Sequence, residues 1–507
     1  MYSYKPGCTF QTLEDIKGKN IVVMGLGLNG GGEACVRFFL RYGANVLATD
    51  MKTAEQLQPT IQKLSDDPEI DSSRLSYRLG EHRIEDFQNA DCVIKNPGVK
   101  FEGNKYLAAA KNIETDISIF LHFTKAPVIA VTGSKGKSST VSAINYGLNK
   151  AGFTAFLGGN ITVSPLTFLE KTNEKTPVVL ELSSWQLADL RGRKALKPKI
   201  CVITKIVPDH QNWYHAMEPY VADKRLIYAD QTSSDYSIFD FEGDEPGTGP
   251  ECGGTWGDFF AKETKGTVLR YAKSELPEGF FGVYQTKDAD GTFCGKAILP
   301  GMKEPETILK NLAVPGEHMK INALNAALVL RLMGISSTQC VEIMGEWPGI
   351  DHRLQFFHEY KNSSGGTFRF YNDSCATVPE AAAAASQSFG KPVYLLTGGT
   401  DKGLELTPLE NTLTGKNRND IPVKSLYLLD GSATEKIIPA LNEKNVKFKG
   451  PFKNLTEMLS SLKEEIDAQS TRNEAVVFSP GATSFGMFAN EFDRGNKFMQ
   501  AVKEIFR

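Results

Sequence analysis

The sequence lacks the features of several protein classes. Its eight cysteines form no Cys-x-x-Cys pair and have no regular spacing, which argues against a disulfide framework or a zinc site and favours reduced thiols. No apolar run approaches the roughly 20 residues that a membrane-spanning helix needs. The net charge is only -3, so no strong field points to nucleic acid or to an acidic membrane. The first ten residues do not read as a signal peptide. We therefore expect a cytoplasmic, monomeric protein without nucleic-acid or membrane partners.

The sequence does have the composition of a globular protein, with 41% hydrophobic and 23% charged residues. Strand-like apolar stretches alternate with helical stretches, which predicts an α/β protein. We expect three domains: a Rossmann-like domain over residues 1–114, a central P-loop ATPase-type domain over 115–349 and a second Rossmann-like α/β domain over 350–507. Residues from about 232 to 310 are rich in Gly, Asp, Glu and Pro, and we expect a surface insertion with some β structure there.

The segment over residues 128–140 predicts a site for a nucleoside triphosphate. An apolar strand, residues 128–132, leads into Gly133-Ser134-Lys135-Gly136-Lys137-Ser138-Ser139, and a helical stretch follows. Glycines let backbone N–H groups surround phosphate oxygens, the lysine reaches the outer phosphates, and a hydroxyl binds magnesium. The loop is shorter than the usual Walker pattern.

A second phosphate loop is predicted near the N-terminus. Residues 21–24 are typical of a strand, and Gly25-Leu26-Gly27-Leu28-Asn29-Gly30 of the turn that follows it. Asp50 ends the next strand, which completes a dinucleotide fingerprint. This pattern indicates a nucleotide without saying which one. An NAD-dependent dehydrogenase would also explain it, but would leave the other phosphate loop unused.

Charged side chains follow two further strands of the central segment. Glu181 ends the strand over 178–182, where a buried carboxylate is costly unless it is paired or bound to a metal, so we expect a magnesium ligand. Asp209 and His210 follow the strand over 200–206, and His210 could bind a second magnesium or a phosphate oxygen. By spacing alone, Lys224 is a solvated lysine on a helical run.

Three strand ends in the last segment carry small and polar residues. These are Asn372-Asp373-Ser374, the stretch 398–403, and Ser479-Pro480-Gly481-Ala482-Thr483-Ser484. Because ligands bind at the carboxyl ends of parallel strands, we expect a site for a small anionic substrate, with Lys402 holding a carboxylate.

Taken together, the motifs resemble the Mur ligase family, and most closely its members that add D-glutamate to UDP-N-acetylmuramoyl-L-alanine. The resemblance covers nearly the whole chain except residues 232–310. It rests on residues 25–30 with Asp50, Asn96-Pro97-Gly98, the loop 132–139, Gly158-Gly159-Asn160-Ile161, Glu181-Leu182-Ser183-Ser184-Trp185-Gln186-Leu187, Asp209-His210 and the position of Lys224.

The resemblance implies an ATP-dependent ligase that forms an acyl phosphate and then an amide. It implies catalytic roles for Lys137, Glu181, His210 and Lys224. It also implies two Mg²⁺ ions, held by Ser138, Glu181, His210 and a carbamylated Lys224. The implied ATP contacts are Gly133, Ser134, Lys135, Gly136, Lys137, Ser138, Ser139, Asn322, Arg353 and Asp373.

The substrate contacts are implied in the same way. Those for the UDP substrate are Leu28, Asn29, Asp50, Lys52, Gly98, Asn160, Ser183, Gln186 and His210. Those for D-glutamate are Thr377, Lys402, Ser484 and Phe485. The chain departs from the family pattern at Lys52, Lys135, Met319, Cys375 and Glu491.

Three alternatives remain beside the dehydrogenase. A sister Mur ligase would add a different residue, and a folylpolyglutamate synthase would share the P-loop but would not need the N-terminal nucleotide unit. A non-enzymatic nucleotide-binding module would lack magnesium ligands, whereas Glu181 and His210 are present.

Overall fold

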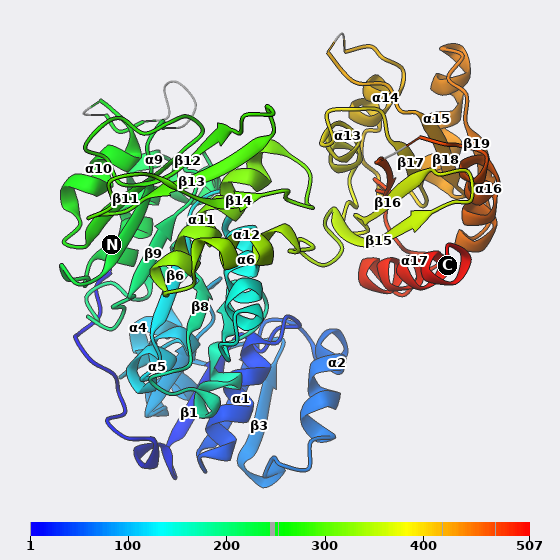
Figure 1. Ribbon diagram of the computed structural model, residues 1–507. Coiled ribbons are helices and arrows are strands. Elements are labelled where there is room, and N and C mark those ends of the chain that lie inside the picture. Colours follow the sequence, from blue (N-terminus) through cyan, green and yellow to red (C-terminus); the bar gives the residue numbers. More distant parts are fainter. Residues whose placement is uncertain (1, 244–248, 252, 418, 472) are drawn as a thin grey trace. The chain divides into compact units, whose positions relative to one another are not determined.

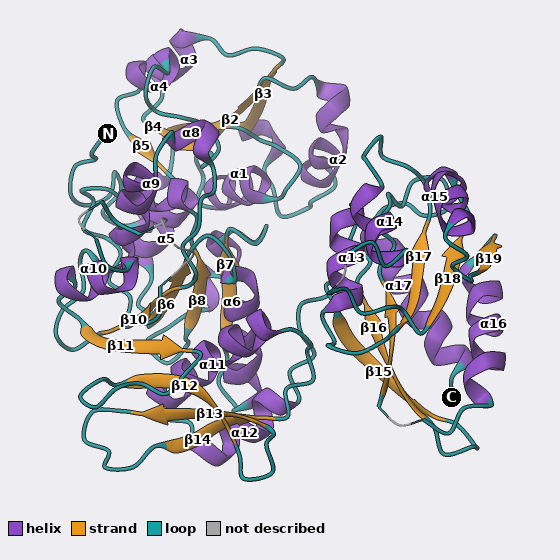
Figure 2. Cartoon of the chain, turned by 90° about the horizontal axis from the view of Figure 1, so that it is seen from above, coloured by secondary structure: helices purple, strands orange, loops and turns teal. Residues whose placement is uncertain are grey.

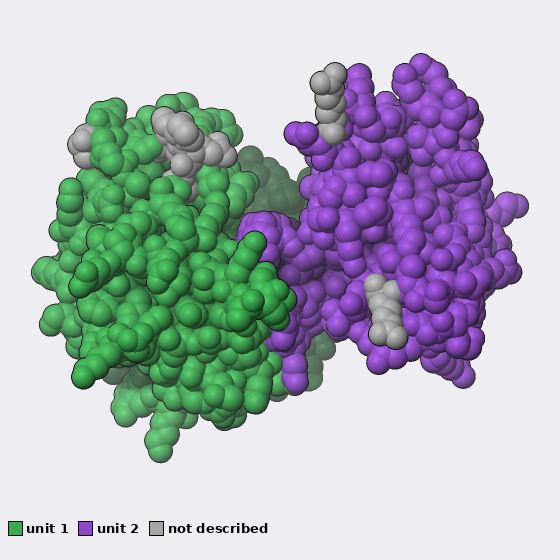
Figure 3. Space-filling model, turned by 45° about the horizontal axis from the view of Figure 1, so that its top comes forward, with its two compact units in different colours: residues 1–310, 321–344 green, residues 311–320, 345–507 purple. Residues whose placement is uncertain are grey.

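The architecture is taken from a computed structural model, which describes residues 2–243, 249–251, 253–417, 419–471 and 473–507. The chain divides into two compact units, coloured separately in Figure 3. The first comprises Met1–Lys310 and Ile321–Met344, and the second comprises Asn311–Lys320 and Gly345–Arg507. Within the described residues, no helix is both long enough and apolar enough to cross a bilayer.

The N-terminal part of the first unit is built on a five-stranded parallel sheet in the order β3-β2-β1-β4-β5. Its strands are β1 (Asn20–Met24), β2 (Asn45–Asp50), β3 (Leu75–Leu79), β4 (Cys92–Lys95) and β5 (Ile113–Glu114). The helices are α1 (Gly31–Arg41), α2 (Ala54–Ser65), α3 (Ile84–Asn89) and α4 (Lys105–Ala109), with short 3-10 turns at Leu13–Ile16 and Ser72–Arg74. The strand-turn-helix predicted around residues 21–42 is thus confirmed as β1 and α1.

The rest of the first unit is built on a nine-stranded sheet in the order β14-β13-β12-β11-β10-β9-β6-β8-β7 (Figure 1). All neighbouring strands from β7 to β12 in this order pair in parallel. The last two pairs, β12 with β13 and β13 with β14, are antiparallel. The strands are β6 (Val128–Thr132), β7 (Phe156–Gly159), β8 (Val178–Glu181), β9 (Ile200–Ile203), β10 (Tyr236–Asp240), β11 (Thr267–Ala272), β12 (Gly282–Lys287), β13 (Phe293–Ile298) and β14 (Glu306–Lys310).

The helices between residues 116 and 345 include some that pack on this sheet. The helices are α5 (Asp116–Phe123), α6 (Lys137–Lys150), α7 (Ser184–Ala188), α8 (Gln211–Tyr214), α9 (Met217–Lys224), α10 (Trp256–Glu263), α11 (Glu317–Leu332) and α12 (Ser337–Gly345), with 3-10 turns at Pro165–Thr167, Leu169–Lys171 and Arg225–Tyr228. Among them, α6 packs on β6 and β8, and α10 packs on β10. Gly147 of α6 lies against Leu330 of α11 so closely that a Cβ there would come within 2.4 Å of Leu330 Cδ1.

Residues 232–310 contain the β structure that was expected there, but the prediction of a separate surface insertion is wrong. Strands β10 and β11 continue the central sheet in parallel with β9, and β12, β13 and β14 extend it further. Ile238, Phe239 and Leu269 are fully buried. Burial of these apolar residues within the sheet outweighs the polar composition of the connecting loops. Residues 244–248 and 252 of this segment lie outside the described part of the chain.

The second unit has one six-stranded sheet in the order β15-β16-β20-β17-β18-β19. It is parallel apart from β15 at its edge. The strands are β15 (Gln355–Lys361), β16 (Thr367–Asn372), β17 (Tyr394–Gly398), β18 (Ser425–Leu429), β19 (Lys449–Phe452) and β20 (Glu474–Phe478). The helices are α13 (Pro379–Gln387), α14 (Thr407–Leu413), α15 (Ser432–Glu443), α16 (Leu455–Asp467) and α17 (Glu491–Ile505).

Helices lie on both faces of this sheet, as Figure 2 shows. Apolar residues of α16 and α17 form one core with the first face, and those of α13, α14 and α15 form another with the opposite face. Strands covered on both faces are apolar almost throughout, which is why short apolar runs revealed them in the sequence. The predicted α/β class is confirmed in both units.

Candidate functional site

The loop between β6 and α6 has the shape of a phosphate cradle. Gly133 and Gly136 both have positive φ, of 144° and 92°. A Cβ at Gly133 would come within 2.0 Å of Thr204 Oγ1, and one at Gly136 within 2.5 Å of Asn322 Oδ1. Only glycine therefore fits at either position. The first N–H groups of α6 have no partner inside the helix, which makes this helix start suitable for an anion.

Two lysines converge on one carbonyl of this loop. Lys137 Nζ donates to Gly133 O at 2.9 Å and to Ser134 O at 3.0 Å. Lys224 Nζ, from the end of α9, donates to the same Gly133 O at 2.7 Å. Burial lowers the pKa of Lys224 well below its usual range, and the charge of Lys137 adds to that effect. The solvated lysine expected from spacing alone is thus a buried one, with 2% of its surface exposed.

Glu181 supplies a buried carboxylate beside the two lysines. Its Oε1 accepts a hydrogen bond from Asn160 Nδ2 at 2.9 Å. Its Oε2 is also buried and has no hydrogen-bond partner among the described residues. Glu181 acts electrostatically on both Lys137 and Lys224, and so does Asp209. An unsatisfied carboxylate oxygen in such a place fits a divalent cation with oxygen ligands.

His210 stands at the start of α8 with a left-handed backbone, at φ 51°. Its ring lies 4.8 Å from that of Trp185, and 43% of its side chain is exposed. It is therefore free to meet a ligand. Within the described part of the chain, no three His, Cys, Asp or Glu side chains gather as a metal site. A magnesium set that uses the exposed Ser138 hydroxyl and a modified Lys224 stays a prediction.

The predicted substrate residues Ser183 and Gln186 contact each other. Ser183 caps α7 by accepting from Gln186 N at 3.2 Å, and Gln186 Oε1 accepts from Ser183 N at 3.0 Å and from Ser183 Oγ at 3.1 Å. This is a capping box, a local signal that was readable in the sequence as Ser-x-x-Gln.

An ion pair missed by sequence reasoning joins two of the predicted substrate motifs. Lys95 Nζ donates to Asp189 Oδ2 at 2.7 Å, and both side chains are almost fully buried. Lys95 directly precedes the Asn96-Pro97-Gly98 turn, and Asp189 ends α7. Pairs between residues this far apart in sequence carry no local signature.

The N-terminal loop is organised by the acidic residue of its fingerprint. Asp50 accepts from Gly27 N at 3.0 Å and from Lys52 N at 2.9 Å. Leu28, Asn29 and Lys52 are exposed around it. The Asp50 carboxylate therefore holds the shape of the loop, and the exposed residues are the ones that a ligand would meet first.

In the second unit, Asp373 is buried after β16. Its Oδ2 accepts from Ser479 Oγ at 2.6 Å, and its Oδ1 accepts from Leu354 N at 3.1 Å. Burial raises the pKa of Asp373 to about 6, and these hydrogen bonds and the charge of Arg353 oppose that rise. Of the other predicted ATP residues, Arg353 belongs to this unit and Asn322 to the first.

The three polar strand ends of the second unit are brought together. Arg494 of α17 is 1% exposed and joins two of them, donating to Ser374 Oγ at 3.0 Å, to Ser374 O at 2.8 Å and to Ala482 O at 3.0 Å. Thr400 joins the third, because Thr483 N donates to its carbonyl at 3.0 Å. Arg494 was missed, since nothing local distinguishes a buried arginine on a polar helix.

The residues predicted to bind D-glutamate differ in how exposed they are at this edge. Ser484 is buried, Thr377 is half-buried, and Lys402 is exposed. Phe485 is 67% exposed. At this edge, hydrogen bonds hold the backbone of the loops, and the exposed side chains of Lys402 and Phe485 are accessible to a small ligand.

Two family models and several named relatives match this chain. The family model described as "Mur ligase middle domain" matches residues 131–330, and "Mur ligase MurD-like, N-terminal domain" matches residues 19–118. A protein named UDP-N-acetylmuramoylalanine--D-glutamate ligase from Treponema pallidum (strain Nichols) is 38% identical over 97% of this chain and 98% of its own. One of the same name from Borreliella burgdorferi (strain ZS7) is 36% identical over 97% and 99%.

Solved structures share the fold. MurF from Acinetobacter baumannii has a TM-score of 0.55 at 14% identity, covering 99% of this chain and 100% of that one. The UDP-N-acetylmuramate-alanine ligase MurC from Thermotoga maritima has a TM-score of 0.51 at 15% identity, covering 96% and 99%. With relatives above 30% identity along nearly its whole length, the chain belongs to the Mur ligase family.

Proposed function

We propose that this protein is an ATP-dependent ligase that adds D-glutamate to UDP-N-acetylmuramoyl-L-alanine, giving ADP and phosphate. The relatives that carry the name of this activity match almost the whole chain. The observation that carries the chemistry is the cluster of Lys137, Glu181 and Lys224 at the phosphate loop. It combines a cradle for phosphate with a buried carboxylate oxygen that lacks a partner.

The proposed reaction has two steps. The alanine carboxylate attacks the γ-phosphorus of ATP, so that an acyl phosphate forms and ADP leaves. The amine of D-glutamate then attacks the acyl carbon, the amide bond forms, and phosphate leaves with the loss of a proton from nitrogen. Phosphoryl transfer of this kind depends on positioning and on charge stabilisation more than on acid-base groups.

Lys137 and the start of α6 would hold the outer phosphates. In the structure Lys137 Nζ rests on the carbonyls of Gly133 and Ser134, within the loop that would surround the nucleotide. Gly136 packs on Asn322, which fixes the loop against α11. A rigid cradle of this kind binds phosphate without reorganisation at the moment of reaction.

Magnesium would be held by Ser138, Glu181, His210 and a carbamylated Lys224, with two ions in all. When bound, it would neutralise the phosphate oxygens. The fit rests on the unsatisfied Oε2 of Glu181 and on the exposed ring of His210. Asn160 fixes the other oxygen of Glu181 and so orients the carboxylate.

The carbamate on Lys224 would form by attack of the neutral amine on CO₂, which releases one proton and leaves a carboxylate on Nζ. An ammonium on Lys224 would first lose its own proton, which the lowered pKa favours, so in sum a buried cation beside Lys137 becomes an anion and two protons are released. The change relieves the repulsion between the two lysines and adds an oxygen ligand near Glu181.

The three-domain division stays part of the proposal. Residues 1–114 would bind the UDP end through Leu28, Asn29, Asp50, Lys52 and Gly98, and residues 115–349 would bind ATP. Residues 350–507 would bind D-glutamate, with Lys402, Thr377, Ser484 and Phe485 around its carboxylates. We also propose that the enzyme acts in the cytoplasm as a monomer.

The direct test supplies ATP, Mg²⁺, D-glutamate and UDP-N-acetylmuramoyl-L-alanine labelled with ¹⁸O in its carboxylate. We expect the D-glutamyl product, and one ¹⁸O atom per released phosphate. Reactions without D-glutamate, or with L-glutamate, D-glutamine or other common amino acids, serve as controls. Equal phosphate release without D-glutamate, or a preference for another acceptor, would contradict the assignment. Unlabelled phosphate would exclude the acyl phosphate.

A further inference from the structure

A cavity in the first unit lies between the turn that follows β4 and the helices α7, α8 and α9. It encloses about 310 Å³, which falls in the range of small-ligand pockets, about 300 to 1,000 Å³. None of the residues predicted to contact ATP, the UDP substrate or D-glutamate is among the described residues that line it. Its described lining includes the aromatic side chains of Tyr2, Tyr4, Phe101, Trp185, Trp213 and Tyr214. The proposed function leaves this cavity without a role.

The aromatic lining offers flat apolar surfaces to a ligand. The ring centroids of Trp185 and Trp213 lie 5.0 Å apart, and the ring of Tyr2 stacks on that of Phe101 at 3.7 Å. Trp185 and Trp213 are only half-buried. Aromatic side chains pack well against another flat ring, so the lining favours a ligand that carries one.

Most of the charged side chains that line the cavity already have partners. Lys95 pairs with Asp189 at 2.7 Å, and Arg191 pairs with Asp223. Glu102 Oε1 accepts a hydrogen bond from the backbone nitrogen of residue 2 at 3.2 Å. Opposite charges in contact largely cancel, so these groups present little net charge to a ligand.

Among the described residues of the lining, Lys100 has the charge that is left for a ligand. It is exposed, and within the described part of the chain its ammonium forms no hydrogen bond or ion pair. Its Nζ lies 5.0 Å from the centroid of the Trp213 ring, which is a cation–π distance. A carboxylate beside this ring would gain a charge-assisted hydrogen bond, whereas a ligand cation would be repelled.

We propose that this cavity is a regulatory site for a small aromatic carboxylate, with its ring against Trp185 and Trp213 and its carboxylate on the Lys100 ammonium. The rings select the apolar part of the ligand, and the one unpaired cation of the described lining selects its charge.

Occupation of the cavity should also affect the ligase reaction. Trp213 belongs to α8, which begins directly after His210, and Tyr214 Oη of the same helix donates to Asp223 Oδ2 at 2.8 Å. Asp223 directly precedes Lys224 on α9. A ligand on Trp213 is thus linked through packed and hydrogen-bonded residues to two groups of the proposed reaction, and we expect it to lower the rate. This regulatory part rests on the proposed function, whereas the binding itself does not.

The binding test uses cinnamate, with cinnamyl alcohol and cinnamylammonium as its neutral and cationic counterparts. Fluorine NMR of the full-length protein labelled with fluorotryptophan reports on each tryptophan, assigned with single Trp→Phe variants. We expect cinnamate to shift the signals of Trp185 and Trp213. The signals of Trp256 and Trp347, which are buried and do not line the cavity, should stay unchanged. The alcohol should bind more weakly than cinnamate, and the ammonium more weakly still.

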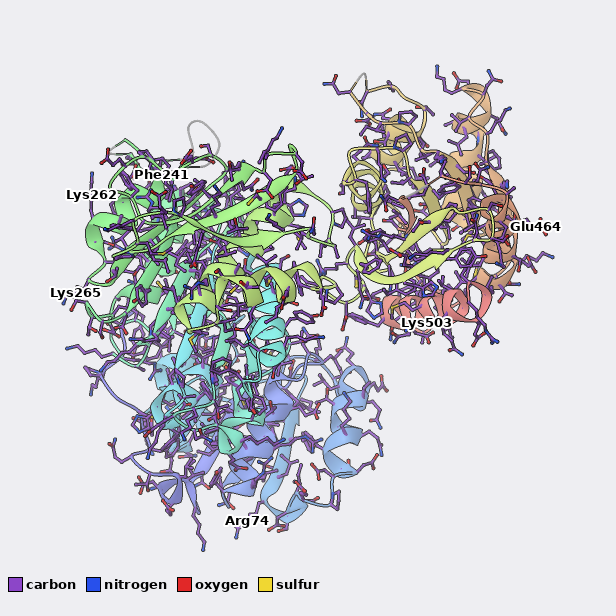
Figure 4. All side chains as sticks on the ribbon, viewed as in Figure 1. Arg74, Phe241, Lys262, Lys265, Glu464 and Lys503 are labelled. Carbon is purple, nitrogen blue, oxygen red and sulfur yellow. The ribbon has the colours of Figure 1, made fainter. Side chains whose placement is uncertain are left out.

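The variants K100M, K100R and K262M test the role of charge. Lys262 is an exposed lysine on α10, and its label lies at the outer edge of the molecule in Figure 4. We expect K100M to bind cinnamate about tenfold more weakly, as befits loss of one charge-assisted hydrogen bond, and to bind the alcohol like the parent protein. K100R and K262M should bind both ligands like the parent protein.

The absence of a shift at Trp185 and Trp213 up to the solubility limit of cinnamate would overturn the site. An equal loss of cinnamate and alcohol binding in K100M, or tighter binding of the ammonium, would overturn the carboxylate. Inhibition by cinnamate that persists at saturating UDP substrate would support regulation, and inhibition that excess UDP substrate removes would make the cavity part of the substrate site instead. A parent protein without ligase activity would contradict the proposed function and leave the NMR result standing.

Discussion

The edge of the central sheet and the edge of the C-terminal sheet place their charged groups in opposite ways. At the central edge, two of the groups proposed to act on phosphate are buried, with Glu181 1% and Lys224 2% exposed, whereas His210 and Ser138 are exposed. At the C-terminal edge, the buried cation is Arg494, and it bonds backbone and hydroxyl oxygens of two loops. The residues proposed to meet the amino acid, Lys402 and Phe485, are exposed.

The difference follows from the two tasks. Stabilising charge that develops during phosphoryl transfer works best with charges fixed in a site of low dielectric constant. Capturing a small amino acid from solution instead needs side chains that the ligand can reach. We infer that burial marks chemistry at the central edge and scaffolding at the C-terminal edge, and the variants below are ordered by how strongly they test that contrast.

The largest effect is expected for Lys224→Ala. It removes both the buried amine and the proposed carbamate, so we expect the amide-forming activity to fall by about 10³-fold or more, in the range found when one charge-stabilising group is removed. The measurement is the rate of product formation at saturating substrates. Added acetate or propionate should restore part of the rate by filling the space of the carbamate.

A matched control is Lys262→Ala, which removes an exposed lysine from the same unit and should keep full activity. If Lys224→Ala folds normally but keeps more than a tenth of the activity, burial at the central edge does not mark chemistry. Loss of activity without any rescue by short carboxylates would count against the carbamate alone.

Arg494→Met tests the scaffolding half of the contrast. It removes three hydrogen bonds from a buried site and leaves the Ser374 and Ala482 carbonyls without their partner. We expect a loss of about 3 kcal/mol in the free energy of unfolding, as for other buried polar networks that lose one member. Urea unfolding of the full chain, followed by circular dichroism, measures it.

Arg369→Met is the control in the same unit. Arg369 is 43% exposed and pairs with Glu359 across β15 and β16. Exposed pairs of this kind contribute about 0 to 1 kcal/mol, so the variant should unfold almost like the parent protein. Arg494→Lys keeps the charge but cannot make all three hydrogen bonds, so its free energy of unfolding should lie between those of Arg494→Met and Arg369→Met. Equal stability of Arg494→Met and Arg369→Met would refute the scaffolding role.

Much of the fold was readable in the sequence because parallel strands covered on both faces appear as short apolar runs. Residues 128–132 and 178–182 are such runs, and they became β6 and β8 with nearly the same bounds. The prediction for residues 232–310 was wrong for the opposite reason. Its strands alternate with long polar loops, and their membership of the central sheet depends on pairing with β9, a partner more than 30 residues away.

The site was readable where a motif is local. Gly133 and Gly136 follow one strand, and their positive φ angles follow from the loop that the motif predicts. Lys224 was not readable by spacing, because its position on Gly133 O depends on the packing of α9 against a loop 91 residues away. Arg494 and the pair of Lys95 with Asp189 have the same long-range character. Tertiary contacts of this kind leave no periodicity in the sequence.

Lys402→Ala tests the exposed contacts of the C-terminal edge. The side chain is exposed and forms no ion pair within the described residues, so its removal should leave the thermal midpoint almost unchanged. Loss of one charge-assisted contact should raise the KM for D-glutamate about tenfold and leave the KM for ATP unchanged. Steady-state kinetics with each substrate varied in turn measures both. A fall in stability with no change in either KM would place Lys402 with the scaffold.

Asp373 is the exception at the C-terminal edge, since it is a buried carboxylate, and its pH dependence gives the smallest expected effect. Burial raises the pKa of Asp373 to about 6 in the folded chain, above the value of about 3.9 in an unfolded one. Between these values the folded state binds more protons than the unfolded state, so the contribution of this group to stability falls as pH rises.

From pH 5 to pH 7 this contribution should fall by about 1 kcal/mol. Asp373→Asn removes the titration, so the variant should lose less stability than the parent protein over the same interval. Urea unfolding of both proteins at pH 5 and pH 7 gives the difference, in which the other carboxyl groups cancel. An identical pH dependence in the two proteins would mean that Asp373 is ionised at both pH values. Its hydrogen bonds from Ser479 and Leu354 would then fully offset its burial, and this edge too would hold a fixed negative charge.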